Sequence, residues 1–361
     1  MEDNLRAEQS RAEQSRAEQS RAEQSRAEQR ENWIDIIKAV CMIFIIMSHL
    51  PYCPEILRKF FTPFFLTGFY FCSGYVMKPL PMTNLIKKKA KTILWPWLGF
   101  SFIEIIMNSL FGSREITFME NLFYNLLQIK GFHESLWFFP NLFMSFILID
   151  ILILKFKKNR LFVISFGIMI VSRIYGMIMP DNLLPWKSVC LPWHIHNIGT
   201  TAFFMIVGYL YKKYLINEKI KKFIPVLIAG FSLIYIIEIY IFRDYEGIGI
   251  WKYPELFIWL IVMMTGLFMI VYISQIKILN KSHALLYIGK NTLLYYALHQ
   301  NLCRIIDHIV NRWNFIYAVS QTITGKWLYT IFFAVFIIMI LIIPIEIIKR
   351  KMRFLIKFEF R

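Results

Sequence analysis

Long apolar runs dominate this sequence and restrict what it can fold into. Ten such segments lie near residues 36–52, 60–77, 92–111, 136–154, 161–179, 197–211, 223–242, 254–273, 285–306 and 327–348. Most approach the ~20 residues that a helix needs to cross a bilayer. Hydrophobic residues make up 57% of the chain, which disfavours a soluble globular fold. We therefore predict an all-α, polytopic integral membrane helical bundle with about ten transmembrane helices.

Lysine and arginine are distributed unevenly between the loops that join these segments. If the N-terminus is cytoplasmic, the inner loops and the C-terminal tail carry more than twice as many of them as the outer loops. This bias predicts that both termini are cytoplasmic. The formal net charge of +17 then reflects topology and contact with anionic lipid, and we expect no nucleic-acid partner. The expected location is the bacterial inner (cytoplasmic) membrane, as a multi-pass protein.

A five-residue repeat occupies the N-terminus. Residues 6–29 read RAEQS four times and then RAEQ. The repeat has no apolar face to bury, so residues 1–30 are predicted to be a disordered, low-complexity tail before a membrane domain at 31–361. One set of codons that spells this unit, AGA-GCA-GAG-CAG-AGC, is the pentanucleotide AGAGC written three times. We hypothesise that gain or loss of one AGAGC unit shifts the reading frame and switches expression; an in-frame duplication of a linker is the alternative.

The spacing of the cysteines and of one histidine pair does not favour a metal site. The five cysteines form no Cys-x-x-Cys motif or Cys/His cluster, and only Cys53 and Cys190 lie near segment ends where pairing is conceivable. His194 and His196 are two residues apart, which on a helix points them to different faces, and no carboxylate is adjacent. We therefore predict no metal site.

The first apolar segment, "WIDIIKAVCMIFIIMSHL", carries polar residues at both of its ends. Asp35 and Lys38 would lie at the inner interface, and His49 would lie ~21 Å further along the helix, near the outer side. Lys38 and His49 are eleven residues apart, close to three whole turns, so they share a helix face. His299, in "NTLLYYALHQN", is also expected in the outer half of its span. Interfacial anchoring and helix packing remain alternatives to substrate contact for these residues.

Two other stretches have an ordinary explanation, and the first of them also has a functional one. The basic run in "LIKKKAKTILWPW" either follows the positive-inside rule or docks a phosphate-bearing donor; its lysines are Lys87, Lys88, Lys89 and Lys91. The stretch "SLWFFPNLF" holds Trp137, a helix-breaking proline and Asn141 at an outer interface. On its own it is an aromatic belt with a kink.

Taken in order, these stretches resemble the acyltransferase-3 superfamily of ten-span membrane acyltransferases, and within it the fucose 4-O-acetylase-like group that O-acetylates bacterial surface sugars. "RENWIDIIKAVCMIFIIMSHL" is similar to the first-helix signature of that family, here Arg30, Asp35, Lys38 and His49. The other matching stretches are "FFLTGFYFCSGYVMKP", "KKKAKTILWPW", "SLWFFPNLF", "TTAFFMIVGYLY" and "YIGKNTLLYYALHQ". They cover about residues 30–350. Family members usually carry arginine in the third-helix basic run, where this chain has only lysine.

The resemblance implies an O-acetyltransferase that moves an acetyl group from cytoplasmic acetyl-CoA to a sugar hydroxyl of a surface glycan, such as capsule or a lipopolysaccharide O-chain. It implies His49 as the catalytic residue and Lys87 to Lys91 as the donor-binding run. Arg30, Asp35, Lys38, Trp137, Asn141 and His299 would support the site or bind substrate. A neutral imidazole suits a general base that deprotonates the sugar hydroxyl, and an acetyl-histidine intermediate is the alternative.

A transporter or flippase for a sugar-lipid or small solute is the alternative function, because polar intramembrane residues would also line a transport pathway. Transporters often show two similar halves. No matched pair of segments broken by glycine or proline is found here, which favours the enzyme.

Overall fold

The computed structural model describes residues 32–111, 117–129, 136–179, 190–215, 222–241, 256–313, 318 and 321–352, and every regular element in these ranges is a helix. Six of the described helices are long and apolar enough to cross a membrane: Met82–Met107, Phe138–Lys155, Lys158–Ile178, Ile224–Ile241, Leu256–Ile273 and Ile323–Lys351. The predicted all-α polytopic membrane fold is confirmed. Arg30 and the RAEQS tail lie outside the described residues.

The elements follow the chain in a simple order. A helix at residues 32–48 comes first. It is followed by α2 (Glu55–Tyr75), α3 (Met82–Lys89), η1 (Ala90–Leu94), α4 (Trp95–Phe111), α5 (Phe118–Leu127), α6 (Phe138–Lys155), α7 (Lys158–Ile178), η2 (Pro192–Asn197), α8 (Ile198–Leu210), η3 (Tyr211–Leu215), α10 (Ile224–Ile241), α11 (Leu256–Ile273), η4 (Leu279–Lys281), α12 (His283–Lys290), α13 (Thr292–Arg312) and α15 (Ile323–Lys351). Each of the ten predicted segments overlaps at least one of these helices.

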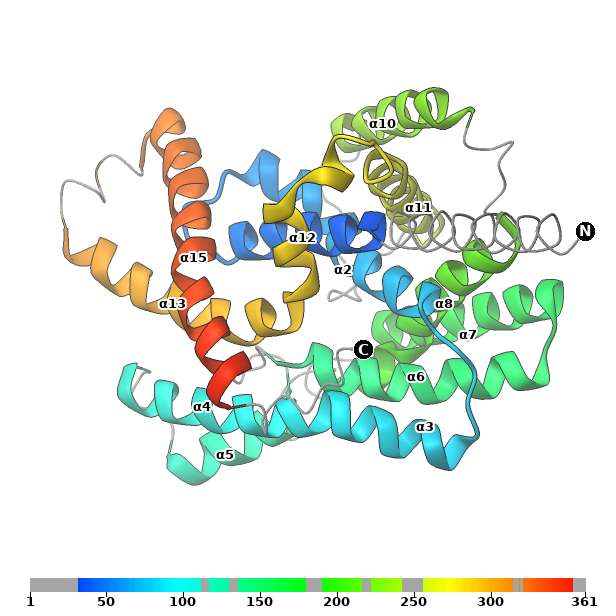
Figure 1. Cartoon of the computed structure of the whole chain (residues 1–361), viewed down its shortest axis with the longest axis horizontal. Coiled ribbons are helices and arrows are strands. Elements are labelled where there is room, and N and C mark those ends of the chain that lie inside the picture. Colours follow the sequence, from blue (N-terminus) through cyan, green and yellow to red (C-terminus); the bar gives the residue numbers. More distant parts are fainter. Residues whose placement is uncertain are drawn as a thin grey trace, which may run out of the picture.

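Helix α8 forms the centre of the bundle. All residues from 198 to 208 are buried, and α8 packs against α2, α6 and α7. Helix 32–48 belongs to the same core, since its buried residues Ile37 and Met42 share one apolar cluster with Phe203 and Phe204 of α8. The pair α10–α11 lies along one edge of the molecule, and α13 and α15 lie on another side (Figure 1). Helix α10 is the least enclosed of the candidate spans, with only Tyr235 and Glu238 buried among its described residues.

Glycine allows α2 and α8 to approach each other closely. A Cβ added to Gly74 would lie 1.8 Å from the backbone oxygen of Met205, and one added to Gly208 would lie 2.0 Å from that of Phe71. Neither position can therefore accept a side chain without moving a backbone. Helices in lipid gain little from the hydrophobic effect when they associate, so close van der Waals packing through small residues is a main source of their affinity.

This contact predicts the effect of adding one methyl group. We expect Gly74→Ala and Gly208→Ala each to reduce the free energy of unfolding by about 1–3 kcal/mol, because the methyl group overpacks the interface. Alanine has a higher helix propensity than glycine, so without the α2–α8 contact each substitution would raise the free energy of unfolding instead. The measurement is the midpoint of thermal unfolding in detergent.

Gly167→Ala on α7 is the matched control, because a Cβ there meets nothing within 4 Å. Equal unfolding midpoints for Gly208→Ala and Gly167→Ala would contradict this account of the α2–α8 contact.

Candidate active site

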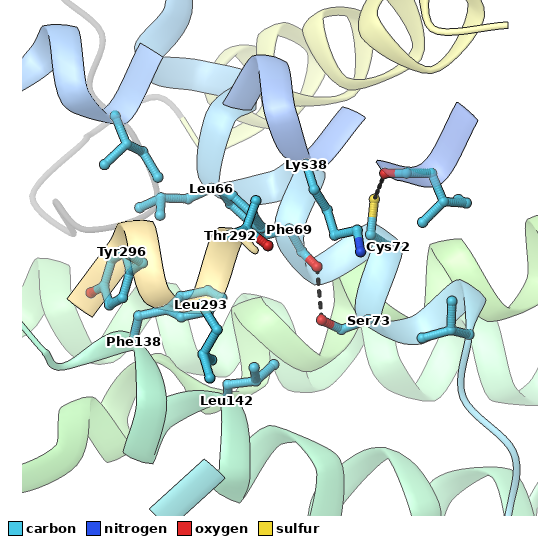
Figure 2. Close-up of a pocket in the computed structure, with 13 residues that line it drawn as sticks. Lys38, Leu66, Phe69, Cys72, Ser73, Phe138, Leu142, Thr292, Leu293 and Tyr296 are labelled. Carbon is cyan, nitrogen blue, oxygen red and sulfur yellow. Dashed lines mark hydrogen bonds between the residues drawn. The ribbon is translucent and has the colours of Figure 1, made fainter. Parts of the chain in front are cut away.

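A cavity lies along the face of helix 32–48 that carries Lys38. Its volume is about 200 Å³, and its walls come from helix 32–48, the end of α2, α6 and the start of α13. Figure 2 shows the amine of Lys38 next to Cys72, with Ser73 on the same helix and with Phe138 and Tyr296 further along the wall. The lining side chains are mostly apolar: Ile34, Lys38, Ile45, Leu66, Phe69, Cys72, Ser73, Val76, Phe138, Leu142, Thr292, Leu293 and Tyr296.

Lys38 supplies the charge in this cavity. Its amine forms an ion pair with Asp35, one turn earlier on the same helix, and both side chains are half-buried. The backbone oxygen of Asp35 packs against Gly289 of α12, where an added Cβ would lie 2.0 Å away. The sequence-predicted pair is thus placed where helix 32–48, α12 and the cavity meet.

Two predicted histidines, separated by 250 positions in the chain, are in contact beyond the other end of the cavity. The rings of His49 and His299 are 4.9 Å apart between centroids and nearly perpendicular, at 83°. His49 is exposed, whereas His299 on α13 is only 1% exposed. Tyr296 connects the two features, because it lines the cavity and its ring lies 5.8 Å from that of His299.

Backbone carbonyl groups select one tautomer of each neutral ring. Nδ1 of His49 lies 2.8 Å from the oxygen of Ile45, and Nδ1 of His299 lies 2.8 Å from the oxygen of Tyr296. A carbonyl oxygen can only accept a hydrogen bond, so each Nδ1 carries the hydrogen and donates it. Each Nε2 therefore keeps its lone pair. For His49 this is the nitrogen that a general base or a nucleophile needs.

Charged side chains surround the imidazole pair. Arg304 on α13 contacts the buried carboxylate of Glu104 on α4, with 3.5 Å between Nη2 and Oε1. Among the described residues, Arg304 and Arg58 are the charged groups that act electrostatically on His49, and Arg304 also acts on His299. Neither arginine stood out in the sequence, because isolated charges near the end of a span are common.

Trp137 and Asn141 lie at the start of α6. The ring of Trp137 stacks on His194, with centroids 4.5 Å apart and planes 22° apart. Asn141 is fully buried; Tyr70 donates to its Oδ1 at 2.8 Å, and its Nδ2 donates to the His194 backbone oxygen at 3.0 Å. Asn141 therefore joins α6, α2 and the turn before α8. Tyr70, a partner in this network, gave no signal in the sequence.

The four predicted donor-binding lysines lie on one continuous helical run. Residues 82–89 are α-helical, η1 is a π-helical stretch, and α4 continues from it. Lys87, Lys88 and Lys91 are exposed, whereas the amine of Lys89 lies 3.3 Å from the centroid of the Phe146 ring on α6. Phe146 is one turn from Leu142, which lines the cavity. The lysine run and the cavity thus share α6 as a wall.

The relation between His194 and His196 differs from the sequence interpretation. Trp193 and His194 have left-handed backbone angles, with φ of 56° and 52°, inside the short helix η2. This turn places the two imidazole rings 5.6 Å apart, and donor atoms of Cys190, His194 and His196 lie within 4.8 Å of one another. The argument that these histidines face apart is wrong, because it assumed a regular helix.

The absence of a metal there nevertheless stays a prediction. Nδ1 of His196 accepts a hydrogen bond from the backbone N–H of Leu191 at 3.2 Å, so its lone pair is engaged. No disulfide joins the five cysteines, all of which lie in described ranges.

Comparison with known proteins places most of the chain in one family. Residues 31–349 match the family described as "Acyltransferase domain". No curated protein and no solved structure matches. The matched range begins next to Arg30 and includes helix 32–48, the cavity and both histidines of the contacting pair. The chain therefore belongs to the acyltransferase-3 family and is a membrane acyltransferase.

Proposed function

We propose that the protein transfers an acetyl group from cytoplasmic acetyl-CoA to a hydroxyl group of a surface glycan, such as capsule or a lipopolysaccharide O-chain, from the bacterial inner membrane. The observation that carries this proposal is the cavity, which follows helix 32–48 past Lys38 and is also lined by Tyr296 of α13, whose ring contacts that of His299. Family membership favours this chemistry over the transporter alternative.

The walls of the cavity suit the slender arm of an acyl-CoA. Most of the lining is apolar, and Lys38 and Ser73 supply polar atoms at one end. The amide groups of the arm could bond to these atoms while its methylene groups contact Leu142 and Leu293. The phosphates of the donor would lie outside, at the exposed amines of Lys87, Lys88 and Lys91. With both termini in the cytoplasm, these lysines face the compartment that supplies acetyl-CoA.

The transfer step follows from the tautomer of His49. Nε2 of His49 takes the proton of the acceptor hydroxyl while that oxygen attacks the thioester carbonyl. A carbon–oxygen bond forms and the carbon–sulfur bond breaks. The proton on Nε2 then passes to the departing thiolate, which leaves as the CoA thiol. His49 returns to its neutral form, and no metal takes part.

Replacing the base tests this assignment. We expect His49→Gln and His49→Ala to reduce ester-linked acetate on the surface glycan about 10²- to 10⁴-fold, the range typical for loss of a general base. The measurement is acetate released from purified glycan by mild alkali, in cells with matched amounts of membrane-inserted protein.

His283→Ala is the control, because this histidine is exposed at the start of α12. If His49→Ala leaves the ester-linked acetate unchanged, the catalytic assignment is refuted.

Narrowing the cavity tests the donor path separately. Leu142 lines the cavity, whereas Leu154 on the same helix is 61% exposed. We expect Leu142→Phe to lower the rate of transfer about tenfold or more, because the larger ring displaces the donor arm from its reactive position. Leu154→Phe is the matched control and should transfer at the normal rate. Equal rates for the two variants would show that the donor does not use this cavity.

We also propose that expression of the enzyme is phase-variable through the AGAGC tract. The tail that the tract encodes lies outside the described residues, so the test is genetic. Sequencing the gene should reveal an uninterrupted five-base period, and clones that differ by one unit should differ in expression of the protein. Synonymous codons that interrupt the period would contradict the proposal.

A further inference from the structure

Two arginines from different helices lie close to the imidazole of His49. Arg58 is the fourth residue of α2, and its Nη2 donates a hydrogen bond to the backbone oxygen of Leu50, the residue after His49, at 3.4 Å. Arg304 lies on α13. Among the described residues, the charged groups that act electrostatically on His49 are these two cations, and no carboxylate is one of them. The surroundings of this imidazole are therefore positively charged.

The acidic side chains in this region do not neutralise Arg58. Glu55, on the same turn of α2, forms its ion pair with Lys59 at 2.8 Å. Asp307 on α13 acts electrostatically on Tyr329 of α15 and is not among the groups that act on His49. In the part of the chain that the structure describes, no carboxylate lies within ion-pair distance of Arg58.

Helix packing alone does not account for Arg58. The side chain is exposed, and its bond to Leu50 uses one of the five N–H donors of the guanidinium. The first turn of a helix already carries a partial positive charge, so a cation there is less favourable than a neutral or acidic side chain. An exposed arginine in this position is suited to bind an anion that comes from outside the protein.

The charge balance of acyl transfer indicates which molecule should carry that anion. When Nε2 of His49 takes the proton of the acceptor hydroxyl, the imidazolium becomes a third positive charge beside Arg58 and Arg304. Nearby like charges disfavour this form. In hydrolase triads a carboxylate of the enzyme offsets the charge, and the described groups that act on His49 include no carboxylate. A negative charge on the acceptor itself would offset it.

We propose that the sugar that receives the acetyl group is acidic: a carboxylate or phosphate group on this sugar pairs with Arg58 and places a neighbouring hydroxyl at Nε2 of His49. A planar guanidinium can donate two parallel N–H bonds to either group, which fixes the orientation of the sugar. The ion pair forms on binding and takes no part in the bond changes. This inference rests on the proposed acyl transfer and names the class of its acceptor.

An acceptor with and without its acidic groups tests the inference. Surface glycan is purified from cells that lack the protein, and in one portion the carboxylates are reduced to alcohols and the phosphate monoesters are removed. The assay uses the full chain in phospholipid-free detergent with acetyl-CoA labelled in the acetyl group. We expect the wild-type kcat/KM to be about 10- to 100-fold higher with the native glycan than with the neutralised glycan.

Substitutions of Arg58 assign this preference to one side chain. In Arg58→Gln the ratio of the two kcat/KM values should fall to about twofold or less, and Arg58→Lys should recover part of it, because lysine keeps the charge without the planar fork. The ratio compares two substrates of one preparation, so a smaller folded fraction does not change it. Arg312→Gln is the matched control and should keep the wild-type ratio, because Arg312 is exposed at the end of α13 and is not among the groups that act on His49.

Three results would overturn the inference. The first is equal wild-type kcat/KM values for the two glycans, and the second is label found by mass spectrometry on a sugar without an acidic group. The third is an unchanged preference in Arg58→Gln, which is expected if Arg58 binds only the phosphate of a lipid. In each of these cases the glycan is still acetylated and the proposed function stands. If the wild type acetylates neither glycan, the proposed function fails and this inference fails with it.

Discussion

The close contact between α2 and α8 is the constraint on which the rest of the bundle depends. Gly74 and Gly208 let the two backbones touch, and α8 then serves as the buried centre against which α6 and α7 also pack. The same end of α2 carries Cys72, Ser73 and Val76, which line the cavity. A backbone shift at this contact would therefore move a wall of the donor path. The stretches "FFLTGFYFCSGYVMKP" and "TTAFFMIVGYLY", which contain Gly74 and Gly208, thus meet in a single interface.

The imidazole pair shows how a polar site is maintained inside an apolar bundle. Each Nδ1 donates a hydrogen bond to a backbone carbonyl group of its own helix, so no other helix is needed to satisfy it. This hydrogen bond also sets the tautomer. Only one nitrogen of each ring is then left for chemistry. The exposed ring of His49 can meet a substrate, while the buried ring of His299 faces protein. This difference in exposure supports assigning proton transfer to the first and support to the second.

Much of the fold and part of the site could be predicted from the sequence. Apolar length identifies the helices because each span is an independent, local signal. The shared face of Lys38 and His49 follows from helical periodicity, and the cavity lies along that face at Ile34, Lys38 and Ile45. The contact between His49 and His299 could not be predicted, because it depends on how helices far apart in the chain pack.

The errors and omissions have specific physical causes. The turn at Trp193 and His194 adopts a left-handed conformation that non-glycine residues seldom take, so periodicity misplaced both histidines. Asn141 is bonded on both sides of its amide by protein groups, which a sequence motif cannot distinguish from a substrate contact. Lys89 is partly covered by an aromatic ring while its neighbours remain exposed, a difference set by the packing of α6.

In the proposed reaction the acetyl group crosses the bilayer from donor to acceptor, and reconstitution into vesicles can measure that transfer. Proteoliposomes would contain the acceptor glycan inside and receive acetyl-CoA labelled in the acetyl group outside, with protein molecules oriented so that the lysine-rich side faces outward. We expect ester-linked label on the enclosed glycan, and loss of that label in vesicles that contain the His49→Gln variant. Label that reaches the glycan only when donor and acceptor share one compartment would contradict it.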